Sequence, residues 1–214
     1  MKEWDLGVRR VEDAARRVSA MIPETMMQPE PLSDDALMCR VRDGDVQALA
    51  SLFDRHQRAL LNFYMRLSGN RDSSEDLVQD VFVRILKYRR SYRPGSRFLT
   101  WMYNIARHAR FDYVRKRRGE IEWDDGYADP VLPSDPAELV EQRQRLALAL
   151  RRLPDDKREL LVLSRFQGLR YEDIGKLLNC EVGTVKVRVH RAMRELGEYF
   201  HQVSREQTAK VEKL

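Results

Sequence analysis

The chain of 214 residues carries 39 Lys and Arg against 34 Asp and Glu, a formal net charge of +5. With 43% hydrophobic residues it can bury a core, and its length fits one sizeable domain or two small ones. The longest hydrophobic run, Leu146 to Leu150, is far short of the roughly 18 residues of a membrane-spanning helix, and residues 1–22 lack the apolar stretch of a secretory signal. We therefore expect no membrane insertion.

Cysteine usage and motif content argue against a cofactor. Cys39 and Cys180 are too few for a disulfide framework and match no metal-ligand spacing, so we expect two thiols in a reducing compartment. A glycine-rich phosphate loop, a nucleophile elbow and a zinc-binding spacing are all absent from the sequence. No cofactor and no metal is predicted.

Residues 1–31 are interpreted as an N-terminal extension, because Pro23, Pro29 and Pro31 interrupt any helical period there. Its first part, from Trp4 to Ile22, has the apolar spacing of a short amphipathic helix. The sequence indicates no role for this segment.

Residues 32–118 have the apolar period of α-helices and predict a helical domain with four helices. The expected ends of these helices are marked by an N-cap at Ser33, an opening at Asp45, a stop at Gly69-Asn70, a capping box of Ser73 with Asp76, a turn at 94–96 and a basic end at 115–118.

Residues 119–136 have the composition of a linker, with glycine and proline among acidic residues and no period. Helical period resumes over 137–204, and residues 205–214 are expected to be a C-terminal tail. No segment shows the alternation of a strand. The predicted fold class is therefore all-α: two small helical domains joined by an acidic flexible linker, the C-terminal one a helix-turn-helix.

The charge is distributed in blocks. Residues 97–118 hold seven Lys and Arg against one acid, residues 119–141 hold eight acids and no base, and residues 182–194 hold four bases and no acid. A solvated face is the ordinary explanation of any one block. The alternation instead favours two DNA-facing segments separated by a strip that avoids DNA.

The last basic block coincides with a helix-turn-helix pattern, in which a helix over 171–178 and a helix from Gly183 are separated by a tight break at 179–181. The inward side of the second helix would consist of Val185, Val189, Ala192 and Leu196. Its outer side would offer to DNA the side chains of Thr184, Lys186, Val187, His190, Arg191 and Arg194. An ordinary helical hairpin with a solvated basic side is the alternative.

The block at 97–118 interleaves cations with aromatic residues, a pattern typical of binding to unstacked nucleic-acid bases. The helical period places Trp101 and Tyr113 in the core. Tyr103 and Phe111 are the aromatic residues predicted to be exposed.

The carboxylates of Glu75, Asp76 and Asp80 are the one cluster that resembles an acid/base or metal site, because Asp76 and Asp80 share a helix face. No histidine accompanies them, and acids near the start of a helix also suit the helix dipole. We interpret the cluster as a polar docking face, with catalysis as the alternative.

Taken together, these motifs resemble the bacterial RNA polymerase sigma factors of the sigma-70 family, specifically the extracytoplasmic-function (ECF) subfamily. The resemblance covers roughly residues 33–200. The similar segments are 76–82 for docking on the polymerase, 98–107 for promoter melting, 112–118 for the minus-ten element, and 171–175 with 183–192 for the minus-thirty-five element.

The resemblance implies a non-enzymatic factor that binds core RNA polymerase in the bacterial cytoplasm and directs promoter-specific transcription initiation. The implied partners are the clamp helices of the largest polymerase subunit, the flap of the second-largest subunit, promoter DNA and an anti-sigma factor. It also implies that the acidic linker lies in a basic polymerase channel normally used by RNA.

The resemblance also assigns residues to three contacts. Core-polymerase binding falls on Asp76, Gln79, Asp80 and Phe82. Minus-ten DNA binding falls on Tyr103, Asn104, Arg107, His108, Arg110, Arg115 and Lys116. Minus-thirty-five DNA binding falls on Gly183, Thr184, Lys186, Val187, Arg188, His190 and Arg191. His108 and Val187 stand where the family often has Asn and a small polar residue, so they bear on which promoter is read.

Two other classes of protein remain open. A simple repressor or activator, with one helix-turn-helix and a helical dimerisation or sensor domain, leaves the basic aromatic block at 97–118 unexplained. An enzyme using Glu75, Asp76 and Asp80 would show metal-dependent activity in its first domain.

Overall fold

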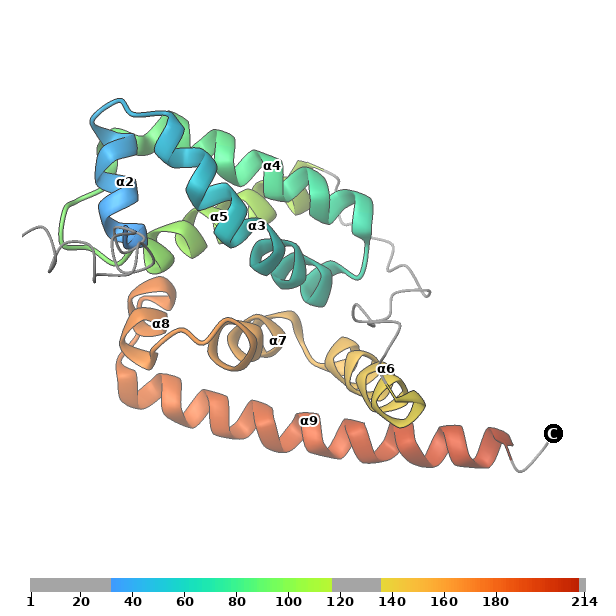
Figure 1. Ribbon diagram of the computed structural model, residues 1–214. Helices are drawn as coiled ribbons and strands as arrows, with labels where there is room; N and C mark the ends of the chain where they lie inside the picture. Colours follow the sequence, from blue (N-terminus) through green and yellow to red (C-terminus); the bar gives the residue numbers. More distant parts are fainter. Residues whose placement is uncertain (1–31, 117–135, 212–214) are drawn as a thin grey trace, which may run out of the picture. The chain divides into compact units, whose positions relative to one another are not determined.

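The computed structural model describes residues 32–116 and 136–211, without the side chains of Ala137 and of 208–211. The described residues form helices and no strand, which confirms the all-α expectation (Figure 1). The expected N-terminal helix and the acidic linker lie outside the described residues. No helix in the described ranges is both long and apolar enough to cross a membrane.

Within residues 32–116 the structure has the α-helices α2 (Asp34–Arg42), α3 (Gln47–Ser68), α4 (Arg71–Tyr88) and α5 (Phe98–Lys116), with the short 3₁₀ helix η2 (Arg89–Ser91) between α4 and α5. We call them the first helix group. Helix α3 packs against α2 and α4, and α4 packs against α5. The core side chains recur at three- and four-residue spacing, so each helix buries one stripe. The largest buried side chains of this group include Leu52, Leu60, Phe63, Tyr64, Ile85, Phe98 and Met102.

Polar side chains fix the ends of these helices. Asp45 accepts hydrogen bonds from the backbone N–H groups of Gln47 and Ala48 at 3.1 and 3.4 Å, as its position before α3 predicts. Gly69 ends α3 in the left-handed conformation, with φ of 69°. The predicted capping box at Ser73 is wrong: Asn70 caps α4 by accepting from the Ser73 backbone N–H at 2.9 Å. The N-cap, and with it the start of the helix at Arg71, therefore lies three residues earlier than predicted.

The second helix group consists of α6 (Ala137–Arg152), α7 (Asp155–Leu161), the π-helical turn η3 (Val162–Phe166), α8 (Tyr171–Leu178) and α9 (Val182–Val211). Helix α9 runs along α6, α7 and α8 and contacts all three (Figure 1).

Helix α9 extends beyond the predicted boundary of the C-terminal tail. It continues through residue 205 to Val211 without a break. Val203 is buried, and Glu206 accepts two hydrogen bonds from Arg152 of α6 at 3.0 and 2.6 Å. Contact with α6 explains why the helix continues where sequence period alone suggested a tail.

The two helix groups belong to one compact unit that begins at Asp34. Helix α5 contacts α8, and α3 contacts α6, α7 and η3. Arg158 of α7 is 6% exposed and donates a hydrogen bond to the Leu67 carbonyl at the end of α3, at 3.2 Å. The same guanidinium donates to the carbonyls of Leu150, Arg151 and Leu153 at 2.7–2.9 Å.

The turn between α8 and α9 requires a glycine at position 175. A Cβ atom there would lie 2.7 Å from the Cys180 carbonyl oxygen, closer than a Cβ atom approaches a non-bonded backbone oxygen in folded proteins. We expect Gly175→Ala to lower the free energy of unfolding by about 1–3 kcal/mol, measured by urea denaturation.

Gly197→Ala is the matched control, because a Cβ at position 197 of α9 meets nothing within 4 Å. It should raise the unfolding free energy by about 0.5–1 kcal/mol through better helix propensity. Equal effects of the two substitutions would contradict the close approach at the turn.

Candidate nucleic-acid interface

The N-terminal half of α9 has two distinct faces. Val185, Val189 and Ala192 are buried in the core that α9 shares with α7 and α8, as predicted. The residues predicted to face DNA are all exposed, namely Gly183, Thr184, Lys186, Val187, Arg188, His190 and Arg191. Along the described part of α9, the first cation paired with an acid is Arg194, which lies 3.9 Å from Glu198. Helix α9 therefore offers uncompensated cations to an anionic partner.

The short helix α8 and the turn after it set the position of that face. Helix α8 covers the predicted range, Tyr171–Leu178, and ends at Asn179 in the left-handed conformation with φ of 49°. Its C-terminal turn is held by a hydrogen bond from the Cys180 N–H to the Gly175 carbonyl at 2.9 Å. The chain then enters α9 at Val182, which is the geometry of a helix-turn-helix.

The predicted docking face on α4 is exposed in part. Asp76 and Gln79 are exposed, and Asp80 is partly exposed. Phe82 does not lie on this exposed face, and its assignment to a polymerase contact stays a prediction. Its side chain is 7% exposed and packs edge-on against Phe53 of α3, with ring centroids 4.8 Å apart. Phe82 therefore holds α4 against α3.

Arg84 links the docking face to α5. Its guanidinium is 2.9 Å from Asp80 on its own helix and 2.9 Å from Asp112 on α5. Asp112 is also 3.1 Å from Arg115, a predicted minus-ten contact. The hydrogen bond from Arg84 is the main reason that the pKa of Asp112 lies below its ordinary value, against the opposing effect of burial.

The carboxylates around α4 are shared among different cations. Glu75 pairs with Arg71 at 2.8 Å, whereas Asp80 pairs with Arg84. Among the described residues, no group of three or more His, Cys, Asp or Glu side chains is arranged to hold a metal.

The predicted minus-ten residues of α5 divide by exposure. His108, Arg115 and Lys116 are exposed, whereas Asn104, Arg107 and Arg110 are partly buried.

The aromatic residues of α5 follow the prediction with one exception. Phe111 is 64% exposed and Trp101 packs against the core, as predicted. The predicted exposure of Tyr103 is wrong: its side chain is 1% exposed, and its hydroxyl donates to Gln167 Oε1 at 2.6 Å. Burial raises the pKa of Tyr103.

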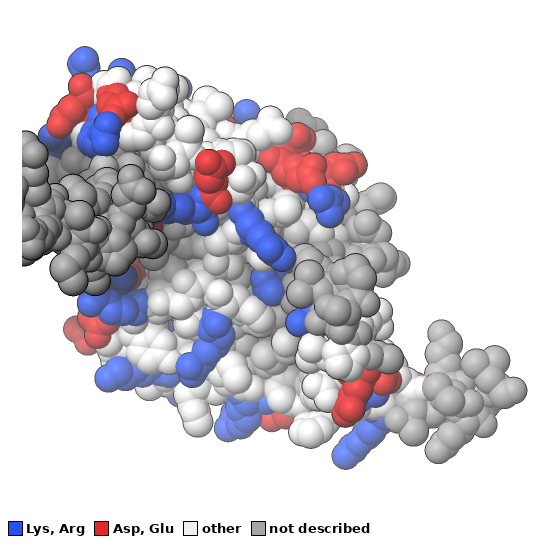
Figure 2. Space-filling model, in the orientation of Figure 1, with Lys and Arg blue, Asp and Glu red and all other residues white. Residues whose placement is uncertain are grey.

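Acidic side chains of the second helix group pair with the arginines of α5. Glu159 lies 3.0 and 3.2 Å from the guanidinium nitrogens of Arg107. Asp155 receives two hydrogen bonds from Arg110, at 2.8 and 2.7 Å. On the face shown in Figure 2, Lys and Arg side chains gather in the hollow between the two groups.

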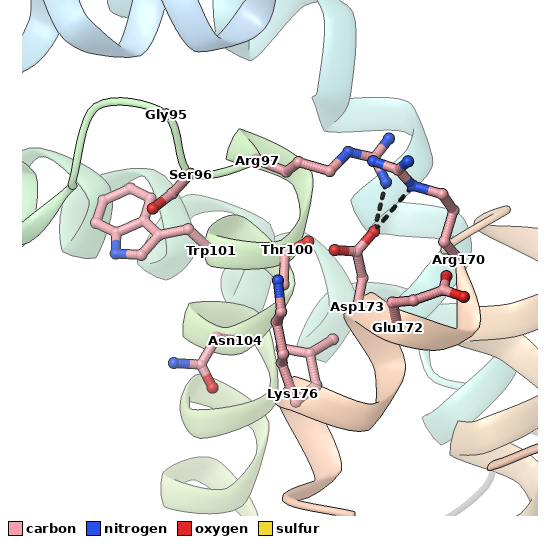
Figure 3. A pocket seen from close by; sticks show the side chains of 11 residues that line it. Gly95, Ser96, Arg97, Thr100, Trp101, Asn104, Arg170, Glu172, Asp173 and Lys176 are labelled. Carbon is pink, nitrogen blue, oxygen red and sulfur yellow. Dashed lines mark hydrogen bonds and ion pairs between the residues drawn. The ribbon is translucent and has the colours of Figure 1, made fainter. Parts of the chain in front are cut away.

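Arg97, which precedes α5, pairs with Asp173 in the first turn of α8, and Arg170 approaches the same carboxylate at 3.5 Å (Figure 3). Burial would raise the pKa of Asp173, but the hydrogen bond from Arg97 and the charge of Arg170 outweigh it and keep the pKa below its ordinary value. These residues line a pocket of about 620 Å³, which Trp101 and Asn104 border on the α5 side (Figure 3).

Sequence reasoning did not identify Asp155, Glu159, Gln167 and Asp173 as partners of α5. Asp155 and Asp173 lie in the first turns of α7 and α8, where acids are common because they suit the helix dipole. Because the helix dipole already accounts for these acids, the sequence did not indicate that their carboxylates also pair with arginines in or next to another helix.

Comparisons with known proteins place these features in a family. Residues 52–120 match the model of Sigma-70 region 2, and residues 143–196 match that of Sigma-70 region 4. The chain is 39% identical over 173 residues to the ECF RNA polymerase sigma factor EcfG of Rhodopseudomonas palustris, covering 80% of this chain and 88% of that protein. It is 34% identical over 175 residues to the RNA polymerase sigma factor CarQ of Myxococcus xanthus, covering 79% and 98%.

A solved structure supports the same assignment. The fold resembles that of the Bartonella quintana sigma factor RpoE, which was crystallised in complex with the anti-sigma factor NepR. The two share 30% sequence identity and a TM-score of 0.61, over 73% of this chain and 98% of that one.

The helix-turn-helix and its exposed basic face define a DNA-binding protein of transcription. With regions 2 and 4 present in order and relatives of this similarity, the chain belongs to the ECF sigma factors of the sigma-70 family. Its function is to direct promoter-specific initiation by RNA polymerase.

The link through Arg84 can be tested by titration. In Arg84→Gln the pKa of Asp112 should rise toward its ordinary value, because its strongest hydrogen-bond donor is lost. With a lowered pKa in the folded state, Asp112 stabilises the protein above its unfolded pKa of about 3.9 and loses this effect as the pH falls below it. Carboxyl ¹³C NMR measures the pKa directly.

Arg71→Gln is the control, because Arg71 pairs with Glu75 near the start of α4 and is not among the cations that lower the pKa of Asp112. An unchanged Asp112 pKa in Arg84→Gln would show that the two helices are not coupled through this guanidinium.

Proposed function

We propose that the described residues of this sigma factor divide the work of initiation among three helices: α4 docks on core polymerase, α5 opens and reads the minus-ten element, and α9 reads the minus-thirty-five element. The observation that carries the proposal is the two-faced N-terminal half of α9. Its predicted DNA-facing residues are all exposed, and the apolar residues between them are buried. The protein acts by binding, without catalysis of its own, in the bacterial cytoplasm where its polymerase is found.

Docking on the clamp helices of the largest polymerase subunit uses Asp76, Gln79 and Asp80. Their exposure on one side of α4 supports this role, and the acidic charge suits a basic partner surface. The flap of the second-largest subunit would hold the second helix group.

Minus-ten recognition uses α5, with the exposed residues His108, Arg115 and Lys116 available in this conformation. His108 Nδ1 lies 2.7 Å from the Asn104 carbonyl oxygen, which can only accept a hydrogen bond. Nδ1 therefore carries the proton, and Nε2 of a neutral ring is left as an acceptor. We therefore expect His108 to suit a base with an amino group, which can donate to Nε2. The Asn that is common at this position in the family can both donate and accept. The remaining residues of the predicted set are less exposed in this structure, namely Tyr103, Asn104, Arg107 and Arg110.

Minus-thirty-five recognition uses the exposed face of α9, where Lys186, Arg188 and Arg191 supply contacts to phosphates and guanine edges. Val187 is 50% exposed and offers an apolar surface that suits the methyl group of thymine.

Control by an anti-sigma factor is part of the proposal. It is supported by the 30% identical Bartonella sigma factor, whose structure was solved with its anti-sigma factor bound. An anti-sigma factor would act by occupying the surfaces that the polymerase needs.

The proposal as a whole is tested by adding the purified protein to core polymerase and selecting transcribed sequences from a random promoter library. Enrichment of two conserved elements at fixed spacing is expected. Enrichment of one element that does not depend on polymerase would favour a simple repressor or activator.

Docking is tested with Asp76→Arg, which reverses the charge of an exposed residue on α4. Because like charges at an interface are strongly unfavourable, we expect affinity for core polymerase to fall at least tenfold, about 1.4 kcal/mol. Asp43→Arg makes the same charge change on the exposed loop after α2 and should leave affinity within about twofold. Fluorescence titration of labelled protein with core polymerase gives both values, and an unaffected Asp76→Arg would refute the docking face.

Base reading by α9 is tested with Lys186→Ala in the holoenzyme. If the side chain reads a base, the loss of about 1–3 kcal/mol should be confined to promoters with the selected base. Equal loss on every sequence would show that Lys186 contacts only phosphate. Arg205→Ala is the control, because this exposed residue lies 19 positions further along α9, about 28 Å away by helical rise.

A further inference from the structure

We propose that Asp35, in the first turn of α2, positions the start of α5 and the loop before it for promoter opening. This loop comprises residues 89–97, between α4 and α5. Asp35 would act through the backbone of α5 and through Tyr92, without touching DNA itself. The inference rests on the proposed function in taking α5 as the helix that opens and reads the minus-ten element.

The start of α5 depends on a carboxylate from outside the helix. The first backbone N–H groups of a helix have no partner within it, and a nearby side-chain oxygen commonly accepts from one of them. The residue before α5 is Arg97, whose guanidinium can only donate, and the first turn of α5 holds no acid. Asp35 supplies the acceptor instead: its Oδ1 accepts a hydrogen bond from the Phe98 N–H at 2.6 Å, across 63 positions of sequence. Its negative charge also suits the positive end of the helix dipole.

The same carboxylate oxygen lies close to Tyr92 in the middle of the loop. The Tyr92 hydroxyl is 2.5 Å from the Ser96 carbonyl oxygen, to which it donates, and 3.3 Å from Asp35 Oδ1. Tyr92 is 2% exposed, and burial together with the charge of Asp35 raises its pKa. The hydroxyl therefore stays protonated and available as a donor. It links the two ends of segment 92–96 to each other and to α2.

A tight turn closes the tip of the loop. Pro94 and Gly95 occupy its two central positions, Gly95 has φ of 81°, and the Ser96 N–H donates to the Arg93 carbonyl at 3.0 Å. Proline followed by a residue with positive φ is the arrangement of a type II turn. This turn fixes the tip, and the contacts of Asp35 and Tyr92 fix the base. The loop is therefore held in one geometry although residues 93–95 are exposed.

The loop borders predicted minus-ten residues of α5. The Tyr92 ring packs edge-on against Trp101, with ring centroids 5.3 Å apart. Trp101, Asn104 and His108 line a pocket of about 380 Å³ together with Ser91 at the end of η2. A shift of Tyr92 would therefore move one wall of the pocket that Asn104 and His108 share.

The adjacent acid has different partners, which makes the role of Asp35 specific. Asp34 pairs with Arg55 at 2.8 Å and with His56 at 2.7 Å, both on α3. Asp34 thus holds α2 against α3, whereas Asp35 holds the start of α5. Asp35 is itself exposed, so its replacement removes hydrogen bonds without leaving a cavity in the core.

Promoter opening is the step that should depend on this positioning. Unpairing and unstacking bases costs free energy, and a protein surface that is already ordered does not add the cost of its own ordering. A loop released from Asp35 would have to be ordered at each opening event. Docking through α4 and duplex binding through α9 do not use the contacts of Asp35, so neither should change.

The test measures promoter opening by holoenzyme that contains full-length variants, on a promoter that the wild type selects from the random library. Fluorescence of 2-aminopurine placed in the minus-ten element follows opening. Asp35→Ala removes the acceptor, whereas Asp35→Asn keeps an oxygen at the same place. Asp34→Ala is the matched control, with the same charge change on the adjacent residue. Hydrogen exchange of the Phe98 amide, measured by NMR on the free protein, shows whether its hydrogen bond is lost.

We expect Asp35→Ala to slow promoter opening about fivefold, the size typical of a lost helix cap, and to speed exchange of the Phe98 amide. Its affinity for core polymerase should stay within about twofold of the wild type, and so should the opening rates of Asp35→Asn and Asp34→Ala, because asparagine is as good a cap as aspartate and Asp34 does not contact α5. Equal losses in Asp34→Ala and Asp35→Ala would reflect a loosened α2 and would overturn the proposal. So would a wild-type opening rate in Asp35→Ala, or a loss in Asp35→Asn as large as in Asp35→Ala.

Tyr92→Phe gives a second test and decides the question if Asp35→Ala does not fold. It keeps the ring that packs on Trp101 and removes only the hydroxyl that holds the Ser96 carbonyl. Promoter opening should slow about threefold, as expected for one hydrogen bond, and an unchanged rate would overturn the proposal. A wild-type holoenzyme that opens no promoter would refute the proposed function instead, which keeps the two failures distinguishable.

Discussion

The turn between α6 and α7 depends on the buried guanidinium of Arg158. The position of the DNA-reading helix α9 follows from this turn. The last carbonyls of a helix have no partner within it and carry partial negative charge. Arg158 satisfies three of them at the end of α6 and one at the end of α3. A buried charge without partners would cost several kcal/mol. With four carbonyl partners, the Arg158 guanidinium instead links the two helix groups and lets α7 pack against α9.

The contacts of Arg158 also place the first turns of α7 and α8 near α5. Acids stand there for a local reason, because Asp155 and Asp173 lie at the positive ends of helix dipoles. In the folded chain, Asp155 also pairs with Arg110, and Asp173 also pairs with Arg97. One carboxylate thus serves two purposes, the stability of its own helix and the neutralisation of an arginine on another. Lys186, Arg188 and Arg191 of α9 are exposed, on the side of their helix away from the buried Val185 and Val189, and form no ion pair among the described residues.

Most of the fold could be predicted from local pattern. Helix α8 and the start of α9 matched within a residue, because Gly175, the break at 179–181 and the apolar stripe of Val185 and Val189 are short-range signals. The start of α4 was misplaced because Asn70 and Ser73 are both good caps, and only the three-dimensional hydrogen bond selects Asn70.

The errors at the candidate site have a common cause. Tyr103 was expected to be exposed because the helical period assigned Trp101 and Tyr113 to the core, and Phe82 was assigned by family resemblance. Both side chains are buried and contact residues remote in the chain, Gln167 and Phe53. Periodicity shows which residues share a helix face, and it does not show which other helix covers that face. The acids that cover α5 are 45 to 76 positions away in sequence from their arginines, beyond the reach of any local pattern.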